Sequence, residues 1–230
     1  TFKHFMLKEI YEQPKAIEDA IRGRIDLDNN VKLGGIADYV DRILESDNIF
    51  ITACGTSWHA AQIGSYLFED ILHKPIKVEY ASEFRYRNKS IDEKSLLIAI
   101  SQSGETADTL AAVSKAKEKN ALTLGIVNVV GSTIARETDC GIYMHAGPEI
   151  GVASTKAFTT QVVILILFAN LLAQRKNITK SKSYLKNLKD TPYLIKDILN
   201  LSDQIYEIAK EYSDASNFLY LGRGYQFPVA

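Results

Sequence analysis

The sequence predicts an α/β fold in which helices cover both faces of a parallel sheet, and three observations lead to that prediction. First, five short apolar runs alternate with longer segments of helical periodicity, as β-α-β units do. Second, two of the runs end in turns rich in glycine and hydroxyl side chains, directly before a helical segment. Third, 230 residues of which 46% are hydrophobic and 24% charged can bury a substantial core. We therefore expect one main globular domain with additions at its ends.

The first 35 residues predict a helical arm. Apolar residues at near-helical spacing, with charged residues between them, indicate an amphipathic helix that needs a surface to lie on. Pro14 suits the first turn of such a helix, because a residue there needs no N–H donor. A second helix is expected over about 35–45, where Ile36, Tyr39, Val40, Ile43 and Leu44 share one side.

The five apolar runs predict the strands of the sheet. They lie at 48–54, 76–80, 95–100, 121–128 and 140–146, and the intervening helices are expected at 57–72 and 106–119. Long helices at about 155–174 and 182–212 follow. A last strand-like run, at 217–224, has almost no sequence after it, which leads us to expect a piece of a longer polypeptide.

Charge and cysteine content argue against several kinds of partner. With 27 Lys and Arg against 28 Asp and Glu, the net charge is -1, so no basic field attracts nucleic acid or an anionic membrane. Cys54 and Cys140 are far apart and, like the four histidines, lack metal-ligand spacing, so we expect structural roles for the cysteines and no bound metal. Two unpaired cysteines also suit a reducing environment, so we expect a cytoplasmic location. The most apolar stretch, 162–173, is about half as long as a membrane span, so we expect it to be a buried helix.

Two strand-to-helix turns predict a phosphate-binding site. The turns are CGTS (Cys54–Ser57) and SQSGET (Ser101–Thr106). On neighbouring strands they would bring two helix N-termini to the carboxyl edge of one sheet, where ligands bind in open α/β folds. Hydroxyls would then surround a phosphate together with free backbone N–H groups, so the site needs no lysine or arginine. The hydroxyl residues are Thr56, Ser57, Ser101, Ser103 and Thr106, and Gly55 and Gly104 allow the backbone to approach closely.

Helix capping is the alternative explanation for these hydroxyls. Serine and threonine are favoured N-caps, and glycine is common in strand–helix turns. Three hydroxyls in one turn, matched by a second turn, are more than capping uses, so we favour ligand binding. Nucleotide motifs do not compete, because no Gly-Lys-Ser/Thr ending of a P-loop occurs and GRGYQF, at Gly222, offers only half of a dinucleotide fingerprint.

A third polar stretch, EIGVASTKAFTTQ (Glu149–Gln161), precedes the long apolar helix. Residues 152–154 could lend backbone groups and a hydroxyl to a polyhydroxy ligand, and Lys156 is a candidate cation. Spacing alone favours a simpler interpretation, in which the stretch is a loop whose Ser154 or Thr155 caps the helix.

Three motifs carry a resemblance to a known family. The stretches ACGTSWHAA, ISQSGETADT and EIGVASTKAFTTQ, in this order and spacing, resemble the isomerase part of the glutamine:fructose-6-phosphate amidotransferases, also called glucosamine-6-phosphate synthases, and more broadly a sugar isomerase (SIS) domain. The resemblance covers essentially the whole chain. It implies a three-layer α-β-α sandwich with a doubly wound, flavodoxin-like sheet of five parallel strands. It also implies three parts: a helical arm or linker at 1–35, an SIS domain at 36–178, and connecting helices with the start of a truncated second SIS domain at 179–230.

The resemblance implies a function for the parent protein, which would convert fructose 6-phosphate and glutamine to glucosamine 6-phosphate and glutamate for UDP-N-acetylglucosamine synthesis. By similarity, the sugar phosphate is held by Gly55, Thr56, Ser57, Ser101, Gln102, Ser103 and Thr106, and its sugar faces Val152 and Ser154. The family's catalytic cysteine would lie upstream of this chain and its isomerase glutamate, histidine and lysine downstream, and Lys156 is not the Schiff-base lysine. We therefore expect this chain to contain no catalytic residue, to use no cofactor, to bind fructose or glucosamine 6-phosphate weakly and to turn nothing over.

The implied partners are a glutaminase domain and a second SIS domain of the same polypeptide, and a second subunit in a homodimer. Two other functions would share the phosphate turns: a stand-alone SIS module that senses a phosphosugar, and a fructosyl-amine deglycase, which has no glutaminase domain. The sequence that flanks this chain in its gene would decide between them.

Overall fold

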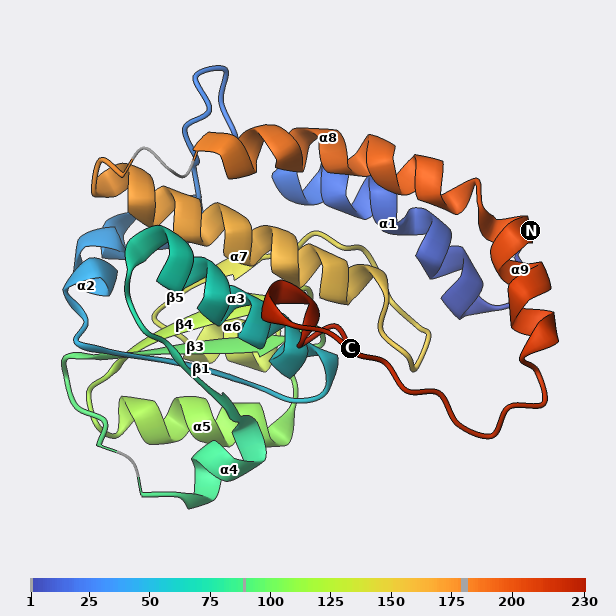
Figure 1. Cartoon of the computed structure of the whole chain (residues 1–230). Coiled ribbons are helices and arrows are strands. Elements are labelled where there is room, and N and C mark those ends of the chain that lie inside the picture. Colours follow the sequence, from blue (N-terminus) through green and yellow to red (C-terminus); the bar gives the residue numbers. More distant parts are fainter. Residues whose placement is uncertain (1, 89, 179–181) are drawn as a thin grey trace.

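The structure is a computed structural model that describes residues 2–88, 90–178 and 182–230. Its centre is a sheet of five parallel strands with helices on both faces, so the molecule is a three-layer α-β-α sandwich (Figure 1). The predicted fold class is confirmed.

All five predicted strands form, in the spatial order β2-β1-β3-β4-β5. They are β1 (Asn48–Ala53), β2 (Lys77–Tyr80), β3 (Ser95–Ser101), β4 (Leu122–Val127) and β5 (Cys140–Tyr143). Every residue of β3 and β4 is buried, as expected where helices cover both faces of a parallel sheet. The order is the flavodoxin-like one, in which the direction of winding reverses between β1 and β3.

Two apolar cores lie on opposite faces of the sheet. Strand residues alternate between them, so that Ile98 belongs to one core and Leu97 to the other. The first core contains residues of α3 (Thr56–Leu72) and α7 (Lys156–Arg175). The second contains residues of α4 (Ala81–Tyr86), α5 (Ala107–Lys117) and α6 (Thr133–Glu137).

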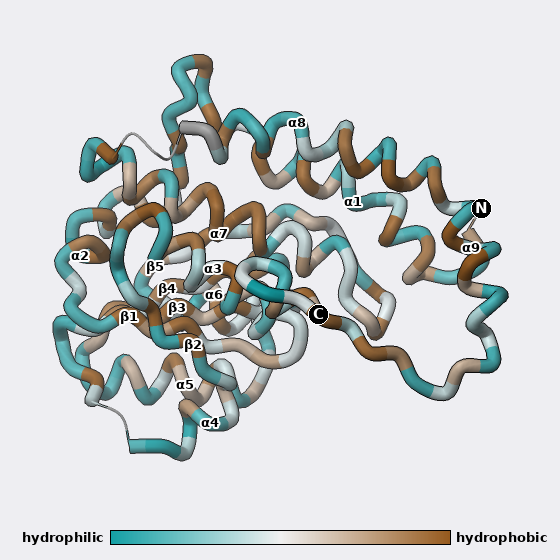
Figure 2. Tube along the Cα trace, viewed as in Figure 1, coloured by the Kyte–Doolittle hydropathy of each residue, from teal (hydrophilic) through white to brown (hydrophobic). Residues whose placement is uncertain are grey.

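Helix α7 is long and apolar enough to cross a membrane by length and composition alone, and Figure 2 shows it as a largely brown tube. Inside this protein, however, 67% of the most apolar 18-residue stretch of this helix is buried. Phe168 packs edge-on against Phe68 of α3, with the ring centroids 5.4 Å apart. The position of α7 is that of the buried core helix predicted from the sequence.

The predicted arm is α1 (Phe5–Ile21), which packs on α7 and on α8 (Lys182–Leu199) and so does lie on another surface (Figure 1). The prediction that Pro14 opens this helix was wrong, since the helix begins at Phe5 and contains Pro14 in its interior. Proline has no N–H to donate to the carbonyl oxygen of Ile10. The side-chain amide of Gln13 donates to that oxygen instead, at 3.1 Å, which explains how the helix continues.

The bounds of three other predicted elements need correction. The helix expected over 35–45 starts as a 3-10 helix, η1 (Gly34–Tyr39), and only then becomes α2 (Val40–Glu45). The helix expected over 182–212 is interrupted after α8, and α9 (Ser202–Glu211) follows. The predicted strand at 140–146 already ends at Tyr143, because His145 turns into a positive-φ conformation.

The run at 217–224 is not a strand. It is an exposed, irregular segment that leads into a 3-10 turn, η3 (Gly224–Gln226), and Leu219 and Leu221 are 85% and 84% exposed. β-forming residues make a strand only beside a partner strand, and none of the described strands pairs with this run. In Figure 2 it appears as a partly brown tube beyond the sheet. The predicted division at 178 and 179 stays a prediction, since 179–181 are outside the described residues.

Candidate functional site

The two predicted phosphate turns lie next to each other at the carboxyl edge of the sheet. CGTS follows β1 and SQSGET follows β3, and these strands are hydrogen-bonded neighbours in which Thr52 pairs with Ala99. The helix after β1 covers one face of the sheet and the helix after β3 covers the other. The turns therefore flank the point where the winding reverses, which is where open α/β sheets bind their ligands.

The SQSGET turn is closed by its own hydroxyls. The backbone N–H of Gly104 donates to Ser101 Oγ at 3.0 Å, and that oxygen lies 3.0 Å from Thr106 Oγ1. The N–H of Glu105 donates to Ser103 Oγ at 3.2 Å. The two N–H contacts use lone pairs of Ser101 and Ser103, so the Ser103 hydroxyl hydrogen stays available. The Thr106 hydroxyl hydrogen is available when Ser101 donates to Thr106. Gln102 and Ser103 are partly exposed at this edge.

Both helices at the turns begin without a side-chain cap. Thr106 is the N-cap residue of α5, but its hydroxyl contacts Ser101 instead of the helix. Gly55, with φ +57°, occupies the same position in α3 and has no side chain to cap with. Among the described residues, none accepts a bond from the N–H groups of Ala107 and Asp108. Capping therefore does not account for these hydroxyls, and free N–H donors remain at a positive helix end.

In the CGTS turn, Thr56 and Ser57 have different environments. Thr56 is exposed at the start of α3, whereas Ser57 is only 8% exposed. Gln161 of α7 donates from Nε2 to Ser57 Oγ at 2.8 Å and so orients that hydroxyl. Gln161 ends the third motif, but the sequence analysis did not include it in the site; its place in that motif was the available signal.

The third motif forms a loop that leads into α7 and is held by two glutamates. Glu149 accepts the N–H groups of Thr155 and Ala157, at 3.0 and 3.1 Å, and the Ser154 hydroxyl at 3.0 Å. It is thus Glu149, and not Ser154 or Thr155, that caps α7 with its side chain. Glu9 of α1 accepts the N–H of Ile150 at 2.6 Å. Val152 is fully exposed, and the contact between Gln161 and Ser57 links this motif to the CGTS turn.

Lys156 is not a free cation for a ligand. Its side chain is 4% exposed, and Nζ lies 2.6 Å from Glu12 Oε2 of α1. The bond from Lys156 is the largest of several influences that lower the pKa of Glu12. Lys156 therefore joins the arm to the sandwich, and the candidate role as a ligand-binding cation is not supported.

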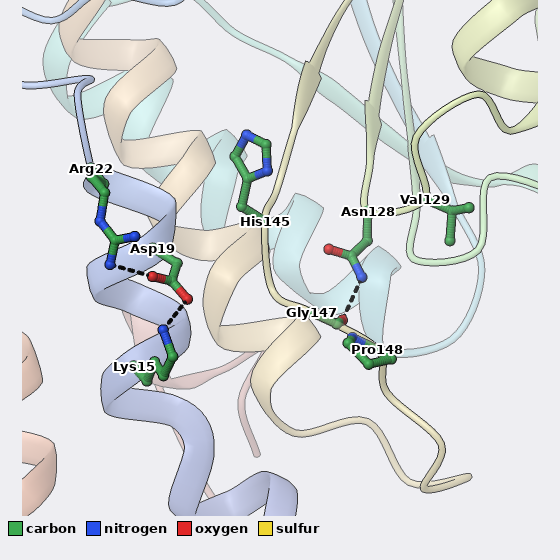
Figure 3. Close-up of a pocket in the computed structure, with 8 residues that line it drawn as sticks. All are labelled: Lys15, Asp19, Arg22, Asn128, Val129, His145, Gly147 and Pro148. Atoms are coloured by element: carbon green, nitrogen blue, oxygen red, sulfur yellow. Dashed lines mark hydrogen bonds and ion pairs between the residues drawn. The ribbon is translucent and has the colours of Figure 1, made fainter.

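A separate cavity lies between α1 and the loops that follow β4 and β5 (Figure 3). Its volume is about 700 Å³, and none of the predicted site residues lines it. The lining residues are Lys15, Asp19, Arg22, Asn128, Val129, His145, Gly147 and Pro148. Lys15 of α1 and Arg22, which follows this helix, both bond to Asp19, at 2.8 and 2.5 Å. The turns at the sheet edge are therefore distinguished from this cavity by their hydrogen-bond donors.

Two observations concern the metal-ligating and thiol side chains that the structure describes. No three His, Cys, Asp or Glu residues among them gather as a metal site requires. Cys140 is buried, and burial raises the pKa of its thiol to about 12, so it is protonated and inert at neutral pH.

Comparison with known proteins places this site in a family context. The SIS domain family matches residues 42–171. The chain is 56% identical over its full length to glutamine–fructose-6-phosphate aminotransferase (isomerizing) of Chlorobaculum tepidum, and it spans 38% of that protein. It is 41% identical to the corresponding enzyme 2 of Homo sapiens, of which it spans 34%. Among solved structures, the C-terminal domain of glucosamine-fructose-6-phosphate aminotransferase from Francisella tularensis superposes with a TM-score of 0.93, at 40% identity, over 99% of this chain and 64% of the other.

Proposed function

Because the chain belongs to the SIS domain family, we propose that it is the part of a glutamine–fructose-6-phosphate aminotransferase that binds the sugar phosphate. In this proposal the two turns receive the phosphate group of fructose 6-phosphate or glucosamine 6-phosphate. The observation that carries it is the pairing of CGTS and SQSGET across neighbouring strands, where two helices begin without a side-chain cap and hydroxyl side chains lie beside their first N–H groups.

The residues of the site divide by the part of the ligand that they contact. For the phosphate we propose Gly55, Thr56, Ser57, Ser101, Gln102, Ser103 and Thr106, and for the sugar Val152 and Ser154. Helix N–H groups and neutral hydroxyls stabilise a phosphate through hydrogen bonds to its charged oxygens, which are stronger than bonds between neutral groups. Ser101 shapes the turn, whereas Ser103 has a hydrogen to donate, and so does Thr106 when Ser101 donates to it.

The chemical steps belong to the longer protein in this proposal. A glutaminase domain would supply ammonia, a second SIS domain would supply the groups that move protons on the sugar, and the assembly would be a cytoplasmic homodimer in amino sugar synthesis. The chain alone is expected to bind the sugar phosphate weakly and to leave it unchanged, so detectable isomerisation of fructose 6-phosphate by the purified chain would contradict the proposal.

Removing the two donating hydroxyls tests the site. We expect Ser103→Ala with Thr106→Ala to weaken fructose 6-phosphate binding by at least about tenfold, since a hydrogen bond to a charged group contributes roughly 1.5–3 kcal/mol. Titration calorimetry measures the dissociation constant. Ser114→Ala is the matched control, because this serine lies in α5, the helix that follows the turn, and its hydroxyl donates to the carbonyl of Leu110. Equal affinity in the double variant and the control would refute the assignment of the turns.

A further inference from the structure

We propose that Glu105 is a positioning residue of the sugar-phosphate site: its carboxylate fastens the SQSGET turn to the start of α6 and so keeps Ser103 and Thr106 in place for the phosphate. The proposal rests on the function proposed above. It assigns a role to Glu105, the one charged residue of this turn. A phosphate cannot be the partner of this carboxylate, because both groups are negative.

Glu105 makes a two-point contact with the neighbouring strand-to-helix connection. The backbone N–H of Thr133 donates to Oε1 at 2.8 Å, and the Thr133 hydroxyl donates to Oε2 at 2.7 Å. Arg136 donates from Nη2 to the same hydroxyl oxygen, at 3.1 Å. Because Ser132, the N-cap residue of α6, makes no side-chain cap bond, the carboxylate of Glu105 takes that role from another segment.

Backbone contacts join the same two segments on either side of Glu105. The N–H of Ile134 donates to the Gly104 oxygen at 3.0 Å, and the N–H of Asn128 donates to the Gln102 oxygen at 3.3 Å. Gly104 also packs so closely on Ser132 that there is no room for a side chain between them. The backbone of the SQSGET turn thus contacts the connection between β4 and α6 at Gln102 and Gly104, and Glu105 adds a side-chain contact to the same connection.

The contact between Glu105 and Thr133 affects the hydroxyls proposed to bind the phosphate, and it does so through Ser103. The N–H of Glu105 itself donates to Ser103 Oγ, so the position of residue 105 decides where the remaining hydroxyl hydrogen of Ser103 can point. Thr106 is the next residue along the chain. Release of the Glu105 side chain would therefore loosen the two residues whose hydroxyls are expected to donate to the ligand.

The contact also keeps a negative charge away from the ligand. A carboxylate two residues from the Ser103 hydroxyl would repel a phosphate if it were free to turn toward it. Its bonds to Thr133, and more weakly the charge of Arg136, lower the pKa of Glu105, so it stays ionised and bonded at neutral pH. Neutralising Glu105 without losing the contact should therefore not harm phosphate binding.

Two substitutions separate positioning from charge. Glu105→Gln can still accept the Thr133 N–H through its amide oxygen, whereas Glu105→Ala loses both bonds. We expect Glu105→Ala to weaken fructose 6-phosphate binding by about tenfold and Glu105→Gln to stay within about threefold of the parent, measured by calorimetry. Glu118→Ala, at the opposite end of α5, is the matched control and should change nothing. Unchanged or tighter binding in Glu105→Ala would overturn the proposal, since it would mean that the contact of Glu105 with Thr133 does not help to hold the phosphate.

A second measurement needs no ligand. Amide hydrogen exchange of Gly104 and Glu105, followed by NMR, should be at least about tenfold faster in Glu105→Ala than in the parent and little changed in Glu105→Gln and Glu118→Ala. Equal exchange in Glu105→Ala and the parent would refute the fastening. If the parent chain failed to bind fructose 6-phosphate, the proposed function would fall, and this exchange experiment would still decide the role of Glu105.

Discussion

Replacing Gly104 with alanine is expected to destabilise the protein by about 2–5 kcal/mol, the sum of two costs at one position. Gly104 has φ +68°, a conformation that costs a residue with a side chain about 1–2 kcal/mol. A methyl carbon there would also lie 2.5 Å from Ser132 Cβ and closer still to its hydroxyl. Because Ser132 is buried and is the N-cap residue of α6, it cannot move aside without disturbing the connection that contacts SQSGET.

Gly131 provides the control that separates the two costs. Its φ is +72°, but a methyl group there would meet nothing within 4 Å, so Gly131→Ala should cost only about 1–2 kcal/mol. Urea unfolding followed by circular dichroism gives both free energies. Adding Ser132→Gly to Gly104→Ala should recover part of the loss. Equal destabilisation by the two alanine variants would show that Gly104 and Ser132 are not in close contact.

Replacing Glu12 with alanine is expected to cost about 2–4 kcal/mol of stability, because it leaves the ammonium group of Lys156 buried without its partner. The pair joins α1 to the first turn of α7, so the arm should also dock less firmly. The pKa of Glu12 lies below its ordinary value of 4.5, with the Lys156 bond as the main cause. The contribution of Glu12 is therefore present above about pH 4.5 and is lost as the pH falls through its folded-state pKa.

Two further variants test this explanation. Glu18 on the same helix pairs with Lys196, but both side chains are about half exposed, so Glu18→Ala should cost less than about 1 kcal/mol. Glu12→Leu combined with Lys156→Met removes both charges and should regain most of the stability lost in Glu12→Ala. A double variant that is no more stable than Glu12→Ala would mean that the charge of Lys156 is not the cause.

Sequence reasoning worked best where local pattern and tertiary environment agree. The apolar runs of β3 and β4 are buried on both sides, so their composition already signals a parallel sheet. The two turns could be placed together because parallel strands end at one edge. The composition of α7 likewise predicts its burial, since a helix that is apolar on nearly all sides packs inside a core.

Prediction from the sequence failed where contacts with residues far away in the sequence decide the structure of a segment or the role of a side chain. Pro14 was expected to open α1, but it lies buried inside that helix, which packs on the distant helices α7 and α8. The run at 217–224 has the residues of a strand but no strand beside it. Lys156 was considered as a ligand cation, because spacing along the chain cannot reveal Glu12, 144 residues away. For the same reason the links from Ser57 to Gln161 and from Glu105 to Thr133 required the structure.

The most direct test of the account is to map the ligand on the chain residue by residue. In a titration of the ¹⁵N-labelled chain with fructose 6-phosphate, the largest amide shift changes should fall at Gly55, Thr56 and Ser57 and at residues 103–107. Inorganic phosphate should perturb the same amides less strongly, and fructose without phosphate should not perturb them. Changes centred instead on Asn128, His145 and Gly147, which line the cavity in Figure 3, would contradict the central claim that the paired turns hold the phosphate.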